Sequence, residues 1–197
     1  MRSVTIAAAL ILMPIVTFAQ DPTTQRKKFE AGQYQQVVES TPAEAAPEVL
    51  YLAAQSQQKL GSTDQAAEIY GRLASRGEGD PWRAIGESGQ KLLQDDADGA
   101  KASAEQAVGA AGDLPEAQFQ LGLVEAKRQD WRAAAAAFDK AAELNPSMAY
   151  AHYYGGLMHY RAKRLDQMAI HFEEFLKLAP EAPERPEVLQ IMKTVRR

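Results

Sequence analysis

The sequence predicts an all-α protein built as a stack of helix pairs, an α-solenoid. Similar residues recur at a spacing of 34 positions: Gly122 and Gly156, Phe138 and Phe172, Pro146 and Pro180. A fixed period of this length is typical of stacked supersecondary units rather than of one globular core. The composition agrees, because 46% of the residues are hydrophobic and Ala, a strong helix former, dominates them. The alternation of apolar and polar residues that marks strands does not occur.

Residues 1–19 have the layout of a secretory signal peptide. A cationic start precedes an uncharged apolar run over residues 4–16, and small residues stand at positions 17 and 19. We therefore expect cleavage between Ala19 and Gln20 and a periplasmic or secreted protein. The alternative is a membrane anchor that retains residues 4–19, although a membrane-spanning helix needs roughly 20 predominantly apolar residues.

The composition also argues against several functional classes. The chain has no Cys, so disulfides, thiolate metal sites and cysteine nucleophiles are excluded. Its net charge of −4 argues against nucleic acid, whose phosphates require a basic surface. With only three His and no phosphate-binding loop or nucleophile elbow, we expect no enzyme, no catalytic residue and no cofactor.

Two segments carry the strongest motif. Residues 115–148 read Leu-Gly in a first helix, Ala-x3-Phe in a second helix and a closing Pro; residues 149–182 read Gly-Gly, Met-x3-Phe and Pro. This pattern resembles the tetratricopeptide repeat (TPR) family, in which each unit is a pair of antiparallel helices. The resemblance implies a right-handed superhelix. Small residues would let the paired helices approach closely, and Pro would end the second helix.

The period divides the chain into consecutive parts. In order, they are a signal peptide (1–19), a partial N-terminal unit (20–46), a TPR unit (47–80), a degenerate unit (81–114), two further TPR units (115–148 and 149–182) and a C-terminal capping helix (183–197). Val188, Leu189 and Met192 fall at helical spacing in the last part, so we expect all three to cover the open end of the stack.

The resemblance also implies a partner-binding groove. In this family the first helices of successive units line a concave groove that holds a segment of another protein. The positions that match in this sequence are Tyr51, Trp82, Phe119, Leu123, Lys127, Tyr150, Tyr153, Leu157, Tyr160 and Arg161. The same face of the earlier units adds Gln55, Lys59 and Ile85. Tyr, Trp and Arg are the residue types that dominate binding energy at interfaces, and they are densest in residues 149–182.

Two candidate metal sites are considered and rejected on the sequence. His152 and His159 lie two helical turns apart, too far for a shared ion, and no carboxylate stands at a ligand spacing from either. Residues 94–105 resemble a calcium loop except at the first ligand, Gln94. A plain turn followed by a capped helix near Asp98 explains this segment better, and weak calcium binding by the segment from Gln94 to Glu105 is left open. We therefore expect no metal ligand.

These observations favour a non-catalytic scaffold or adaptor that binds other proteins or peptides in its groove. The alternative is a membrane-tethered periplasmic assembly factor anchored through residues 4–19. Self-association through the terminal repeats is left open, and contact with a membrane is expected only if the N-terminal segment is retained.

Overall fold

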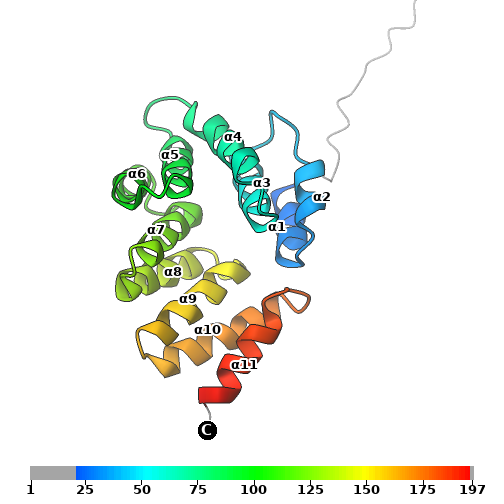
Figure 1. The fold of residues 1–197 in the computed structure, drawn as a ribbon, viewed down its shortest axis with the longest axis vertical. Helices are drawn as coiled ribbons and strands as arrows, with labels where there is room; N and C mark the ends of the chain where they lie inside the picture. The colour runs from blue at the N-terminus through cyan, green and yellow to red at the C-terminus, as the bar shows by residue number, and fades with distance from the viewer. Residues whose placement is uncertain (1–20, 196–197) are drawn as a thin grey trace, which may run out of the picture.

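The computed structural model describes residues 21–195, which form eleven α-helices and no strand. In chain order the helices are α1 (Pro22–Glu30), α2 (Tyr34–Glu39), α3 (Pro47–Lys59), α4 (Thr63–Ala74), α5 (Pro81–Leu93), α6 (Ala97–Ala110), α7 (Pro115–Lys127), α8 (Trp131–Leu144), α9 (Ala149–Arg161), α10 (Leu165–Leu178) and α11 (Arg185–Val195). Sequential helices pack on one another along a curved stack (Figure 1). The prediction of an all-α solenoid is confirmed.

The period is visible in the positions at which helices begin. The first helices of four successive units begin 34 residues apart, at positions 47, 81, 115 and 149. The second helices begin at positions 63, 97, 131 and 165, again 34 residues apart. The degenerate sequence of residues 81–114 therefore keeps the helix geometry of its neighbours although, apart from Trp82, it lacks their aromatic residues.

The turn inside each unit follows the same period. Gly61, Asp95, Gln129 and Lys163 each have a positive φ, between 60° and 77°. Each ends a first helix in the same way, and the N–H of the residue that follows it donates to a carbonyl five residues earlier, as Ser62 does to Gln57 at 2.9 Å. This is the left-handed helix cap that Gly adopts most easily. Three of the four units hold a non-Gly residue in it.

Close packing of glycine against an aromatic ring joins the two helices of a unit. A Cβ atom at Gly122 would lie 2.7 Å from the ring of Phe138, and one at Gly156 would lie 2.4 Å from the ring of Phe172. Both rings are fully buried. The Gly and Phe positions of the repeat motif are therefore direct partners, because the ring occupies the space that a side chain would need.

The ends of the stack meet. Gly32, in the turn between α1 and α2, faces Pro183, whose Cδ would lie 3.0 Å from a Cβ at that glycine. The hydroxyls of Tyr34 and Tyr150 are 2.9 Å apart, and Lys59 forms a 2.7 Å ion pair with Glu184. In Figure 1 the helices accordingly curve around until α1 lies near the connection that precedes α11. These contacts bring the two ends of the expected concave groove together.

The capping helix α11 covers the stack with two of the three residues expected to do so. Val188 is fully buried and Met192 is 8% exposed, whereas Leu189 is 48% exposed. The expectation for Leu189 is wrong, because a helix of 3.6 residues per turn directs adjacent residues to different faces.

The predicted signal peptide, its cleavage position and the alternative anchor over residues 4–19 lie outside the described residues. Within residues 21–195, the helices are too short or too polar for any of them to cross a bilayer.

Candidate functional site

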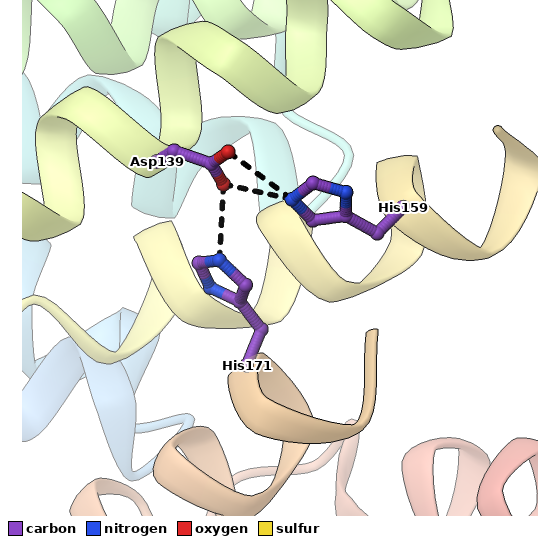
Figure 2. Close-up of side chains that lie close together, drawn as sticks. All are labelled: Asp139, His159 and His171. Carbon is purple, nitrogen blue, oxygen red and sulfur yellow. Dashed lines mark hydrogen bonds and ion pairs between the residues drawn. The ribbon is translucent and has the colours of Figure 1, made fainter. Parts of the chain in front are cut away.

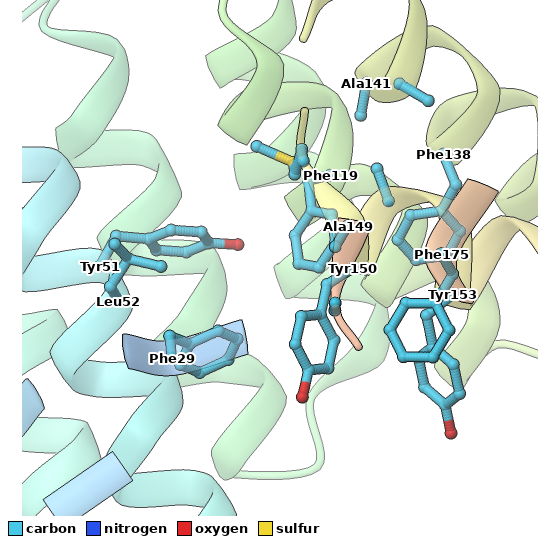
Figure 3. Close-up of a cluster of buried hydrophobic side chains, with 14 of the residues drawn as sticks. Phe29, Tyr51, Leu52, Phe119, Phe138, Ala141, Ala149, Tyr150, Tyr153 and Phe175 are labelled. Carbon is cyan, nitrogen blue, oxygen red and sulfur yellow. The ribbon is translucent and has the colours of Figure 1, made fainter. Parts of the chain in front are cut away.

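An open cavity lies on the inner face of the stack, and we call it the inner cavity. Its volume is about 380 Å³, and the residues that line it come from α1, α3, α5, α7 and α9. Figure 3 shows the buried cluster beside it, in which Phe29 of α1 and Phe119 of α7 take part. These helices are distant in the sequence, so the curvature and closure of the stack bring them to one space.

The wall of the inner cavity combines aromatic and aliphatic side chains with a few polar groups. Its apolar members are Phe29, Leu92, Phe119, Leu123, Tyr150 and Tyr154. Its polar members are Gln55, Gln58, Lys59 and Lys127. A concave and mostly apolar wall with a small number of placed polar groups is typical of ligand-binding pockets.

Both lysines of the wall have acidic partners. Lys59 forms its ion pair with Glu184 and also lies 5.1 Å from the ring centre of Tyr150. Lys127 forms a 2.5 Å ion pair with Asp95, whose side chain is 81% exposed. An exposed pair of this kind is worth little. A carboxylate arriving from outside could therefore replace Asp95 as the partner of Lys127 at small cost.

A chain of hydroxyl groups fixes the aromatic ring at the closure. Tyr150 donates to the carboxylate of Glu184 at 2.7 Å, which leaves its oxygen to accept the hydroxyl proton of Tyr34 at 2.9 Å. Burial raises the pKa of Tyr150 well above its usual value, and the hydrogen bond that it donates to Glu184 acts in the same direction. Tyr150 therefore stays a neutral donor, and its ring is held in one orientation beside Phe29, 4.9 Å between centres.

Four of the ten residues predicted for the groove line the inner cavity: Phe119, Leu123, Lys127 and Tyr150. Tyr51 lies beside it in a narrow recess under α1, where its hydroxyl donates to Gln120 at 2.8 Å. Tyr51, Phe119 and Tyr150 are only 2%, 4% and 3% exposed. The aromatic part of the predicted groove is thus more enclosed than an open TPR surface would be.

Two other predicted residues are packed between helices. Trp82 is half-buried and meets Tyr51 edge to face, with ring centres 6.0 Å apart. Tyr153 is 6% exposed; its ring lies 5.2 Å from that of Phe175 on α10, and its hydroxyl donates to Glu187 of α11 at 3.0 Å. Phe119 and Tyr153 occupy equivalent positions 34 residues apart. Phe119 nevertheless lines the inner cavity, whereas Tyr153 faces the capping helix α11.

The last three predicted residues lie outside the inner cavity. Leu157 is half-buried against the hydrophobic core, and Tyr160 is 37% exposed. The guanidinium of Arg161 lies 5.7 Å from the ring centre of Trp131, at the start of α8. Each unit is rotated with respect to its neighbour, so equivalent positions do not share one space. A role of these residues in partner binding stays a prediction.

Sequence reasoning missed several wall residues. Tyr154 follows Tyr150 by one helical turn, and extending that face by four residues would have found it. Gln58 is beside the predicted Lys59. Phe29 and Leu92 carried no signal, since α1 is out of register with the other units and residues 81–114 lack the motif.

The interpretation of the histidines on the sequence is corrected by the structure. Asp139 of α8 stands between His159 of α9 and His171 of α10, and its Oδ1 is 2.9 Å and 3.0 Å from their Nε2 atoms (Figure 2). Burial raises the pKa of Asp139, but hydrogen bonds from the two imidazoles outweigh burial and hold that pKa below its usual value. The sequence analysis considered His159 together with His152, but in the structure His159 lies beside His171. The Nε2 atom of His152 instead lies 3.2 Å from the carbonyl oxygen of Pro146.

The segment that resembles a calcium loop forms the turn between α5 and α6 and the first part of α6. Asp96 caps α6 and accepts the N–H of Gly99 at 2.9 Å. Asp95 pairs with Lys127, and Asp98 pairs with Arg128. Its acidic side chains thus have protein partners, as expected of a capped turn.

Comparison with known proteins agrees with this architecture. Tetratricopeptide repeat models match residues 119–183 and residues 48–76. A comparison with curated protein sequences gives no match. Among solved structures, a thermophilic TPR protein of Thermus thermophilus is 18% identical with a TM-score of 0.62, and the alignment covers 89% of this chain and 97% of that one.

Two further solved structures share the fold. YrrB, described as a TPR protein with an unusual peptide-binding site, is 16% identical with a TM-score of 0.53 and coverage of 87% and 86%. MamA is 17% identical with a TM-score of 0.51 and coverage of 82% and 94%. The periodic helix pairs, the Gly–Phe contacts and these matches define a helical-repeat solenoid. The chain belongs to the tetratricopeptide repeat family.

Proposed function

We propose that this protein is a non-catalytic scaffold that binds a short segment of another protein in the inner cavity. The observation that carries the proposal is the convergence of five first helices on one amphipathic cavity of about 380 Å³. This volume lies in the range of about 300–1,000 Å³ that is usual for ligand sites. YrrB, which shares the fold, is described as binding a peptide, and this supports a peptide as the ligand class.

The chemistry of the wall favours one kind of segment. Phe119, Leu123 and Tyr154 offer a surface for an aromatic or aliphatic side chain, while Lys59 and Lys127 stand beside it with ammonium groups. An apolar residue next to an acidic residue would satisfy both features. Because the two ends of the stack meet, the inner cavity favours a loop or a chain end over a long extended peptide.

We also propose that the protein works outside the cytoplasm, on the strength of the signal-peptide pattern of residues 1–19. The competing proposal is a tethered assembly factor that keeps residues 4–19. N-terminal sequencing of the exported protein separates the two: a chain that begins at Gln20 supports the free form, and a chain that keeps residues 4–19 supports the tether.

The binding proposal is tested by affinity capture from the native periplasm, followed by mass spectrometry. Three baits are compared: the parent chain, the double variant Leu123→Gln with Lys127→Ala, and the control Leu165→Gln with Lys140→Ala. Leu165 is 43% exposed and the side chain of Lys140 is 44% exposed, and neither lines the inner cavity. The control therefore makes the same chemical changes elsewhere.

We expect a protein that the parent and the control retain and that the cavity variant loses. Its affinity for the three purified chains would then be measured by calorimetry, with at least a tenfold loss for the cavity variant. Equal capture by all three baits would show that the inner cavity is not the binding site.

A further inference from the structure

The cluster of Asp139, His159 and His171 has no part in the proposed binding cavity. It joins α8 of one repeat unit to α9 and α10 of the next (Figure 2). We propose that it is a binding site for one divalent transition-metal ion, of which zinc is the best match, and that the ion fastens the last two repeat units together.

The spacing of the three ligand atoms fits a single ion. One atom from each residue can be chosen so that all three lie within 4.8 Å of one another. The two nitrogen–oxygen distances are 2.9 Å and 3.0 Å. A zinc ion with ligand distances of about 2.0–2.2 Å holds tetrahedral ligand atoms about 3.3–3.5 Å apart. To admit the ion, the two nitrogen–oxygen distances would lengthen by a few tenths of an ångström, and the most widely separated ligand atoms, up to 4.8 Å apart, would approach by about 1.3–1.5 Å.

The ligand types select the class of metal. Two imidazole nitrogens and one carboxylate oxygen suit zinc and other late first-row ions, whereas magnesium and calcium prefer oxygen ligands alone. Three protein ligands leave one tetrahedral position for water. The side chain of Asp139 is 41% exposed, so an ion and its water can reach the cluster from solvent.

The imidazoles are held in place before any ion arrives. His159 is 1% exposed and His171 is 8% exposed. Gly155 of α9 makes room for the second ring, because a Cβ there would lie 3.0 Å from Nδ1 of His171. The rings stack on each other with centres 5.3 Å apart. Both Nε2 atoms are thus fixed toward one carboxylate.

The surroundings set the expected affinity. Nδ1 of His159 and Nδ1 of His171 are buried without a hydrogen-bond partner. Ligating imidazoles usually donate from the second nitrogen, and loss of that support typically weakens metal binding by 10- to 100-fold. We therefore expect zinc binding about 10- to 100-fold weaker than in a site whose imidazoles are fully supported.

The test is a calorimetric titration of the full chain with zinc chloride, after removal of any affinity tag and of bound metal. We expect one ion per chain, with at least a tenfold loss of affinity in Asp139→Asn, His159→Gln and His171→Gln. His152→Gln is the matched control, since His152 packs against the ring of His171, with ring centres 5.3 Å apart, but offers no ligand atom to the cluster. Magnesium chloride should give no binding.

A second readout keeps the proposal testable if a buried histidine variant unfolds. Asp139→Asn alters a half-exposed side chain, and circular dichroism would establish that it folds. Zinc at 100 times its dissociation constant should raise the melting temperature of the parent and of His152→Gln by about 5–10 °C, but not that of Asp139→Asn. The proposal would be overturned if the parent bound no zinc below 100 µM, or if Asp139→Asn bound zinc as tightly as the parent. If His152→Gln lost as much affinity as the cluster variants, the choice of ligands would be overturned.

Discussion

Residues 81–114 and residues 149–182 form units of the same length with different interiors. Their first helices both have 13 residues and their second helices both have 14. The first unit buries small residues, among them Gly86, Ser88 and Ala104. The second buries large rings, such as those of Tyr153 and Phe172.

The comparison shows that the period depends on different residues from those of the proposed binding cavity and the proposed metal site. Helix lengths and the left-handed caps at Asp95 and Lys163 reproduce the 34-residue unit in both cases. The large side chains of the last unit add the features that distinguish this protein, since Tyr150 closes the inner cavity and His159 belongs to the proposed metal site. Residues 81–114, whose interior is made of small side chains, contribute one residue, Leu92, to the wall of the inner cavity.

The largest effect is expected from truncating the central ring of the last unit. Phe172 is fully buried, so Phe172→Ala should lower the free energy of unfolding by about 3–5 kcal/mol. The equivalent position two units earlier is Ala104, which is also fully buried; Ala104→Gly should cost only about 1–2 kcal/mol. Urea unfolding measures both. Similar losses would mean that the two interiors are equally important to stability.

A pH-dependent effect is expected where α1 meets the last unit. Helix α5 is capped by its own Asp80, whereas the first N–H of α9, on Ala149, donates to Glu30 of α1 at 3.0 Å. Burial raises the pKa of Glu30 to about 7, against the lowering effects of that hydrogen bond and of Arg26. The folded state therefore favours the neutral acid.

The sign of the effect follows from that shift. The stability contributed by neutral Glu30 is complete below about pH 4.5 and is lost as the pH rises through about 7. Glu30→Gln cannot ionise, so relative to the parent it should gain up to about 3 kcal/mol between pH 4.5 and pH 8. Urea unfolding at several pH values measures this difference. Parallel pH curves for the two chains would contradict the burial of an ionisable Glu30.

An added methyl group at a glycine between two packed helices should be tolerated less well in residues 81–114 than in residues 149–182. A Cβ at Gly86 would lie 2.6 Å from backbone atoms of Ala74 and Tyr70, whereas one at Gly156 would meet the ring of Phe172. Backbone yields less than a side chain, so Gly86→Ala should cost more than Gly156→Ala, both within about 1–3 kcal/mol. Gly109→Ala is the control: nothing lies within 4 Å of its Cβ position, and it should gain up to about 1 kcal/mol. The reverse order in thermal unfolding would show that α4 and α5 separate easily.

The smallest effect is expected at the helix caps. Lys163→Gly should stabilise the protein by about 0.5–1 kcal/mol, because Lys adopts a positive φ at a cost that Gly avoids. Asp95→Gly should gain less, since Asp tolerates this conformation better and the change removes the ion pair with Lys127. Differential scanning calorimetry can rank the two. A larger gain for Asp95→Gly would mean that neither the tolerance of Asp for a positive φ nor the ion pair with Lys127 affects stability at this turn.

Much of the fold could be predicted from the sequence, because helix ends and caps depend on local residues that recur. The Gly–Phe spacing indicated the helix pairs, and the regular period indicated the solenoid. The inner cavity could be predicted only in part. Its shape depends on rotation between units and on α1, whose turn at Gly32 falls outside the period. The positions of Phe29 and Leu92 in its wall follow from that global curvature.

The cluster of Asp139, His159 and His171 could not be predicted for a related reason. Its members lie 20 and 12 residues apart on three helices, a spacing that matches neither one helical face nor the repeat. Only the packing of α8, α9 and α10 brings them together. Spacing rules for ligands on a single helix therefore could not place a carboxylate beside His159.

The central claim is that the inner cavity is the site at which this protein binds its partner. Hydrogen–deuterium exchange of the chain, with and without the protein captured from the periplasm, tests it most directly. We predict slower exchange in α3, α7 and α9, around Lys59, Leu123 and Tyr154, and unchanged exchange in α6 and in the exposed part of α10. Protection confined to the outer helices, with α3, α7 and α9 unchanged, would contradict the account.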